Sequence, residues 1–123
     1  MAKRAIVSQS LDSCPINPVV DLVFSRWTTP ILWVLRLHGR QRFNEIERRL
    51  PTISPKVLTQ RLRQLERDGL VARTYYAEIP PRVEYEMTQL ALSLVPVFET
   101  LVDWSEAHLH EVEQARHAYD EAI

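Results

Sequence analysis

Apolar residues recur at helical spacing through the first half of the chain, and prolines mark where the helices begin. Three prolines follow a residue that can cap a helix, in the pairs Asn17-Pro18, Thr29-Pro30 and Ser54-Pro55. Proline is tolerated at the first helical position, and a preceding Asn, Thr or Ser side chain can accept a hydrogen bond from the free N–H groups there. The pattern therefore predicts helices that begin at these three prolines.

The spacing of apolar residues also predicts what each helix packs against. The run over 31–37 is too dense for a surface helix, so it predicts a buried central helix that ends at Gly39. Residues 43–50 carry apolar side chains at i, i+3 and i+7, which predicts a short amphipathic helix before Pro51. The helix over 55–68 has an inner stripe formed by Leu58, Leu62 and Leu65.

The pattern changes to alternation after Gly69, which favours strands. Residues 70–76 are rich in β-formers, and apolar and polar residues alternate over 83–88. Two adjacent prolines between these segments break the ladder, so we expect a hairpin whose stiff, exposed tip is 79–82. Thr88 can cap a final helical region, in which Pro96 predicts a kink or a junction between two helices.

An apolar seam runs along this final region in steps of three and four residues. Its members are Val95, Phe98, Val102, Ser105, Leu109 and Val112, continuing weakly to Tyr119 and Ile123. Such a seam can pack on the chain's own core or pair with a second subunit. Its length in so short a chain favours the second subunit, so the interface is expected to contain Val95, Phe98, Val102, Leu109 and Val112.

Length and composition narrow the class of protein. The 123 residues suffice for one domain, and the two glycines leave no room for a Gly-rich phosphate loop. No apolar run approaches a membrane span, the N-terminus lacks the apolar region of a signal peptide, and the single cysteine cannot form a disulfide within the chain. The chain is therefore expected to be cytoplasmic.

Charge is strongly segregated although the net charge is only −1. Residues 36–73 hold ten Lys/Arg against four Asp/Glu, a local charge of +6, whereas residues 83–123 hold one Arg against nine Asp/Glu, a local charge of −8. Affinity for DNA depends on local positive potential more than on total charge. The basic block coincides with two short amphipathic helices followed by a hairpin, which predicts a winged helix-turn-helix that binds DNA.

Several segments of the chain resemble the HxlR family of bacterial transcriptional regulators. The most specific are LTQRLRQLE at 58–66 and PPRVEY at 80–85, and Trp27, TPIL at 29–32 and RFNEI at 42–46 support them. The resemblance covers roughly residues 14–104. It implies a winged-helix homodimer, distantly related to MarR regulators, whose N- and C-terminal helices form the interface.

Together these observations predict a mostly α-helical fold with a small β-hairpin. We expect an N-terminal arm at 1–13, a winged helix-turn-helix DNA-binding domain at 14–104 and a helical dimerisation extension at 105–123. The function expected is that of a sequence-specific transcriptional regulator, most simply a repressor, that binds a palindromic operator as a homodimer. The alternative is a winged-helix module for protein or RNA contact without operator specificity, because a fold does not determine a function.

Eight side chains are expected to contact double-stranded DNA: Arg42, Arg49, Ser54, Lys56, Thr59, Gln60, Arg63 and Arg82. At 100° per residue the polar side chains of the 55–68 helix lie opposite its leucine stripe, with Thr59 on the flank. Gln60 can pair with adenine, and Lys56 or Arg63 with guanine. Ser54, Arg42 and Arg49 are expected at phosphates, and Thr59 at a phosphate or a thymine methyl. Arg82, at the wing tip, is expected in the minor groove or at its flanking phosphates. Arg61 is expected at the DNA backbone or in an internal ion pair.

Cys14 is a candidate sensor of oxidants or electrophiles. A thiol near a helix N-terminus can be unusually reactive, and the resemblance implies this role because several family members sense oxidants, quinones or aldehydes through a cysteine at this position. The alternative is an unreactive, half-buried cysteine. A disulfide at Cys14 would have to link two subunits or include a small thiol.

Other chemistry is expected to be absent. The chain has no nucleotide loop, HExxH sequence or nucleophile elbow, so we expect no enzyme and no cofactor. The histidines of the C-terminal region lack an i, i+4 pair and predict no metal site. Five aromatic residues could line a ligand pocket, although core packing is the commoner role of such residues: Phe24, Trp27, Trp33, Phe98 and Trp104.

Overall fold

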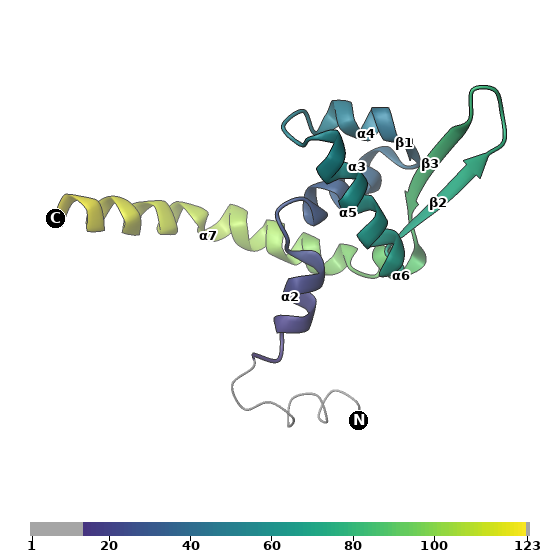
Figure 1. Ribbon diagram of the computed structural model, residues 1–123. Helices are drawn as coiled ribbons and strands as arrows, with labels where there is room; N and C mark the ends of the chain where they lie inside the picture. Colours follow the sequence, from purple (N-terminus) through teal and green to yellow (C-terminus); the bar gives the residue numbers. More distant parts are fainter. Residues whose placement is uncertain (1–13, 123) are drawn as a thin grey trace.

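The computed structural model describes residues 14–122, which form a small body and one long projecting helix (Figure 1). The predicted N-terminal arm and Ile123 lie outside the described residues. The elements in chain order are α2 (Asn17–Val23), α3 (Thr28–His38), β1 (Gln41–Arg42), α4 (Phe43–Arg49), α5 (Pro55–Arg67), β2 (Val71–Tyr76), β3 (Arg82–Met87), α6 (Gln89–Leu92) and α7 (Val95–Ala122).

The predicted caps are right for α5 and wrong for the two earlier helices. The Ser54 hydroxyl accepts a hydrogen bond from the Val57 N–H at 3.2 Å, and α5 begins at the following proline. Asn17 and Thr28 are instead the first helical residues of α2 and α3, neither of which has a side-chain cap. The hydroxyl of Thr29 donates to the Val23 carbonyl at 2.7 Å, so it ties α3 to the end of α2 rather than capping its own helix.

The three strands form one antiparallel sheet in the order β1-β3-β2. β2 and β3 pair from Val71 opposite Met87 to Tyr76 opposite Arg82. β1 was not predicted, because two residues are too few to show alternation. The hairpin was predicted, but Arg82 already belongs to β3, so the unpaired tip is 77–81.

The core lies where α3, α5 and the sheet meet. Ile31 and Leu32 of α3 and Leu58, Leu62 and Leu65 of α5 are almost fully buried, as predicted for the central helix and the leucine stripe. Ile46 of α4 and Leu70 and Val71 at the start of the wing complete this cluster. The result is a helix-turn-helix, α4 and α5, held on α3 and followed by a β-wing, which confirms the predicted fold class.

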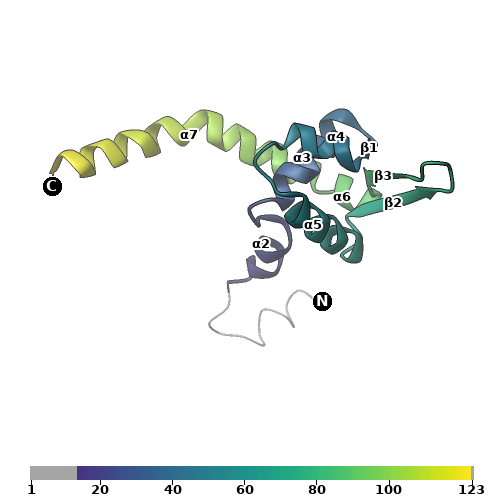
Figure 2. The same cartoon turned by 45° about the horizontal axis from the view of Figure 1, so that its top comes forward.

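Helix α7 projects away from this body, as Figures 1 and 2 both show. Thr88 caps α6, accepting a hydrogen bond from the Ala91 N–H at 3.2 Å, and Pro96 lies in the first turn of α7. The predicted junction between two helices is therefore confirmed. Within residues 14–122, none of the helices is both long and apolar enough to cross a membrane.

Candidate nucleic-acid interface

Helix α5 has one apolar side on the core and one polar side in solvent. Its leucine stripe is buried, whereas Lys56, Gln60 and Arg63 are exposed on the opposite side, as the helical spacing predicts. These side chains offer an ammonium group, an amide and a guanidinium, which are donors and acceptors that can match base edges in a major groove. Ser54 precedes them at the exposed start of the helix.

The flank of α5 is less free than its outer side. The Thr59 hydroxyl donates its hydrogen to the Pro55 carbonyl at 2.8 Å, so its methyl group and the lone pairs of its oxygen remain for a ligand. Arg61 is half-buried, and within residues 14–122 no ion pair involves it. Of the two roles expected for Arg61, the internal ion pair is therefore not observed.

The two arginines expected on α4 and just before it have different surroundings. Arg42 is exposed, and its backbone N–H donates to the Glu45 carboxylate at 2.8 Å, which closes the first turn of α4. Arg49 donates from Nε to Gln41 Oε1 at 3.2 Å, and its Nη1 lies 3.1 Å from the His38 ring. Arg49 thus connects α4 to the end of α3, although it remains exposed.

Arg82 is held at the base of the wing tip rather than free at its end. Its Nη2 lies 3.3 Å from Glu78 and its Nε lies 3.2 Å from Glu84, while its guanidinium carbon is 4.1 Å from the centre of the Tyr76 ring. The Tyr76 contact follows from the strand register, because Tyr76 and Arg82 are direct cross-strand partners, whereas Glu78 and Glu84 are near neighbours of Arg82 along the chain. Arg82 was expected at the wing tip, and it is the first residue of β3, paired with both carboxylates.

Two arginines that the sequence pattern did not single out lie near these groups. Arg40 bonds to the Tyr76 hydroxyl and to Glu86, each at 2.7 Å, and the bond to Glu86 is the main reason that the pKa of Arg40 is raised. Arg73 lies 3.5 Å from Glu66 of α5. Strand pairing brings Arg40 to Tyr76 and Glu86, and the packing of α5 beside β2 brings Arg73 to Glu66. No spacing rule in the sequence could have found these contacts.

A small polar cavity of about 240 Å³ separates α5 from the wing. It is lined by Thr59, Arg63, Glu66, Arg73 and Tyr85. Burial raises the pKa of Tyr85, Arg73 and Arg63 oppose that effect, and Glu66 adds to it. Tyr85 is therefore protonated at neutral pH, and its hydroxyl can donate beside the exposed polar side of α5.

The predicted dimer seam is partly core and partly exposed. Phe98 is only 6% exposed and contacts the ring of Phe24, the residue after α2, edge-on, with centroids 6.4 Å apart. Val102 and Leu109 are 39% and 43% exposed, and Val95 and Val112 are half-buried. Phe98 thus anchors α7 to the body, while the later seam residues have little of their own chain to pack against.

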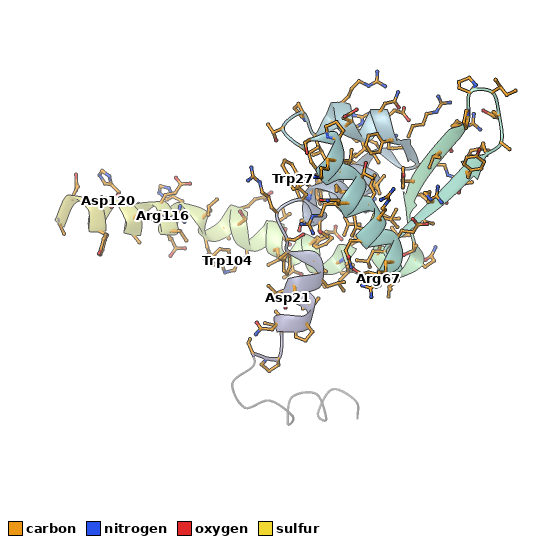
Figure 3. The ribbon with its side chains drawn as sticks, viewed as in Figure 1. Asp21, Trp27, Arg67, Trp104, Arg116 and Asp120 are labelled. Atoms are coloured by element: carbon orange, nitrogen blue, oxygen red, sulfur yellow. The ribbon has the colours of Figure 1, made fainter. Side chains whose placement is uncertain are left out.

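The aromatic residues do not form one pocket. Phe24, Trp33 and Phe98 line an apolar groove of about 540 Å³ together with residues of α3 and α7. Trp27 instead packs against the core beneath Arg26, and Trp104 lies on the projecting part of α7 against His108 (Figure 3). Cys14 is exposed just before α2, where its carbonyl accepts a hydrogen bond from the Asn17 N–H at 2.9 Å.

A helix-turn-helix with an exposed polar, basic face and an adjoining wing defines a winged helix-turn-helix protein, the architecture of DNA-binding regulators. The sequence model described as HxlR-like helix-turn-helix matches residues 22–113. The chain belongs to this family, and its relatives are named HTH-type transcriptional regulators. One of them, YdeP of Bacillus subtilis, is 36% identical over 116 residues, which cover 92% of this chain and 90% of that protein.

Solved structures agree with this assignment. The redox regulator HypR in its reduced form is similar with a TM-score of 0.75 and 33% identity, covering 82% of this chain and 99% of that one. The reduced form of the transcriptional regulator YodB from B. subtilis has a TM-score of 0.70 and 34% identity, covering 78% of this chain and 94% of that one.

Proposed function

We propose that the protein is a sequence-specific repressor that binds a palindromic operator as a homodimer. The observation that carries this proposal is the exposed side of α5, where Lys56, Gln60 and Arg63 face solvent directly opposite the buried leucines. A helix anchored in this way can enter the major groove without disturbing the core. A dimer seated on an operator that overlaps a promoter would exclude polymerase.

Each proposed contact has a chemical role. Gln60 can form two hydrogen bonds with adenine, and Lys56 or Arg63 can donate to guanine. Ser54 and Thr59 lie at the start and flank of α5, where phosphate oxygens or a thymine methyl are in reach. Arg42, Arg49 and Arg82 are proposed at phosphates, which set the register of the protein on the duplex.

Replacing Gln60 by alanine is expected to relax sequence preference at one base pair. The loss of a bidentate contact costs about 1–3 kcal/mol on the matched site and little on a site mismatched at that position. Arg82→Ala is expected instead to weaken binding to every sequence similarly and to flatten the salt dependence. Titrations of both variants on matched and mismatched duplexes, at several salt concentrations, measure this difference. An equal loss on every sequence for both variants would contradict the assignment.

Selection of bound DNA by the purified protein tests the proposed function as a whole. An inverted repeat is expected among the selected sequences, with half-sites separated by one helical turn or a multiple of it. Binding to that repeat no tighter than to random duplex or to RNA would favour the alternative, a winged-helix module for protein or RNA contact. Transcription from a promoter carrying the repeat distinguishes repression from activation.

We further propose that Cys14 modulates this binding. Cys14 is exposed and precedes α2, and Phe24, just after α2, packs on Phe98 in the proposed dimer seam of α7. Similarity to HypR, described as a redox regulator, supports such a role. A diamide oxidation would join the Cys14 thiols of two subunits, or one thiol and a small thiol, in a disulfide; the two thiols lose two electrons and two protons, which reduce the diamide N=N bond to a hydrazine. A quinone or aldehyde would instead add to the thiolate.

Treatment with diamide is expected to lower operator affinity of the wild type by about 5- to 150-fold, the usual range of coupling between two sites. Cys14→Ser should keep its untreated affinity after the same treatment, because it has no thiol. Fluorescence anisotropy with a labelled operator measures both, and non-reducing gels reveal linked subunits. Identical responses of the two proteins would rule out Cys14 as the sensor.

A further inference from the structure

The wing carries a cation whose charge is already matched within the protein. Arg82 lies between two carboxylates, with Nη2 3.3 Å from Glu78 and Nε 3.2 Å from Glu84, and its side chain is only 28% exposed. The plane of the guanidinium also lies over the Tyr76 ring, at 4.1 Å. A guanidinium in this state has less positive potential to offer a DNA phosphate than a free one.

The two carboxylates differ in how firmly they are held. Glu84 is 17% exposed and is shared with Arg40, whose Nη1 lies 3.6 Å away. Arg40 also donates to the Tyr76 hydroxyl. Arg40 therefore connects Glu84 and Tyr76, the two residues that also contact Arg82. Glu78 is 49% exposed, lies in the unpaired wing tip, and has no second ion-pair partner among the described residues. Glu78 is therefore the partner that can leave without disturbing the sheet.

The Glu78 side of Arg82 borders an open polar cavity of about 460 Å³. The cavity lies between the wing tip and the start of α4, and Arg42, Asn44, Glu78 and Arg82 contribute to its lining. Arg42 is exposed there, and within residues 14–122 no side-chain ion pair involves it. A group bound in this cavity would meet two guanidinium groups from two different elements and one carboxylate.

We propose that this cavity receives a backbone phosphate of DNA, and that Glu78 occupies the phosphate position on Arg82 in the free protein. A carboxylate and a phosphate both present oxygens to a guanidinium, so one can replace the other on Nη2. Glu84 and Tyr76 keep Arg82 in place during the exchange. The Glu78 carboxylate lowers affinity for all DNA sequences alike, because phosphate contacts carry no base information.

The test compares Glu78→Gln in the wild-type background and in an Arg82→Gln background, on a random-sequence duplex over a range of salt concentrations. Glu78→Gln is expected to tighten binding about two- to fivefold, the range that an exposed ion pair supports. The slope of log affinity against log salt should stay near the wild-type value, because Arg82 meets the same phosphate in the complexes of both proteins. In the Arg82→Gln background the same substitution should change neither quantity, because the competing pair no longer exists.

The variant Glu78→Asp distinguishes the effect of the contact with Arg82 from the effect of the negative charge, and it leaves Arg82 unchanged. It keeps the negative charge but shortens the side chain, so it should tighten binding as Glu78→Gln does if the contact matters. An equal gain from Glu78→Gln in both backgrounds, wild-type affinity for Glu78→Asp, or no gain at all would overturn the proposal.

The competition by Glu78 rests on the proposed DNA binding, and different results would contradict the competition and the DNA binding. Absence of wild-type binding to any duplex removes the proposed function, whereas normal wild-type binding with no Glu78 effect removes only the competition.

Discussion

Replacing Leu62 by alanine is expected to lower the free energy of unfolding by about 2–5 kcal/mol. Leu62 is 1% exposed in the middle of the stripe that holds α5 on the core. Truncation removes three carbon atoms from a site enclosed by Leu58, Leu65 and the residues of α3 and α4, which can refill it only in part. Urea unfolding followed by circular dichroism, at one fixed protein concentration, measures the change.

The matched control for Leu62→Ala is Arg67→Ala on the same helix. Arg67 is exposed in the last turn of α5, so its removal should change stability by less than about 0.5 kcal/mol. A loss from Leu62→Ala no larger than that of the control would mean that the stripe does not anchor α5. The exposed position of Gln60 and Arg63 on α5 would then need another explanation.

Replacing Leu109 by glutamate is expected to separate the proposed dimer and to reduce affinity for the proposed palindromic operator by about 10²- to 10⁴-fold. Leu109 is 43% exposed on the projecting part of α7, and a buried carboxylate at a subunit interface is costly unless it is paired. Two linked DNA-binding domains bind more tightly than one, because binding of the second domain becomes intramolecular once the first is bound. A monomer loses that gain in affinity. Affinity for a single half-site should stay near that of the wild type.

Sedimentation equilibrium gives the oligomeric state of Leu109→Glu, and anisotropy titrations on full and half operators give its affinity. The control is Gln114→Glu, which adds the same charge to the opposite side of α7, because five residues turn a helix by about 140°. An unchanged dimer for Leu109→Glu would show that the seam beyond Phe98 is not the interface. Dissociation of both variants would point to the charge of α7 rather than to its apolar side.

Much of the fold could be predicted because its signals are local. The leucine stripe of α5 repeats at helical spacing, and Ser54 before Pro55 marks where that helix begins, so both its start and its buried side were correct. The same reasoning failed at Thr29, whose hydroxyl bonds to Val23 of the preceding helix. A side chain that can cap a helix can also bond to a neighbouring segment, and only the packed structure decides which occurs.

The predicted DNA-contacting residues divide in the same way. Lys56, Gln60 and Arg63 are exposed as expected, because their direction follows from the helical period and the buried stripe. Arg82 was predicted at the wing tip, whereas it is the first residue of β3 and lies between Glu78 and Glu84. Its contact with the Tyr76 ring depends on which residues face each other across β2 and β3, and the sequence alone does not define that register.

The amino-acid sequence by itself determined the helix-turn-helix, the wing, the basic face of α5 and the family, because periodicity, capping pairs and motifs are local properties of the chain. The tertiary structure alone decided that β1 joins the wing, that Phe98 belongs to the core, and that Arg40 bonds to Tyr76 and Glu86. These features arise from side chains 36 or more positions apart, or from strand pairing. Contacts between such positions form only when the whole core packs, so no local pattern reports them.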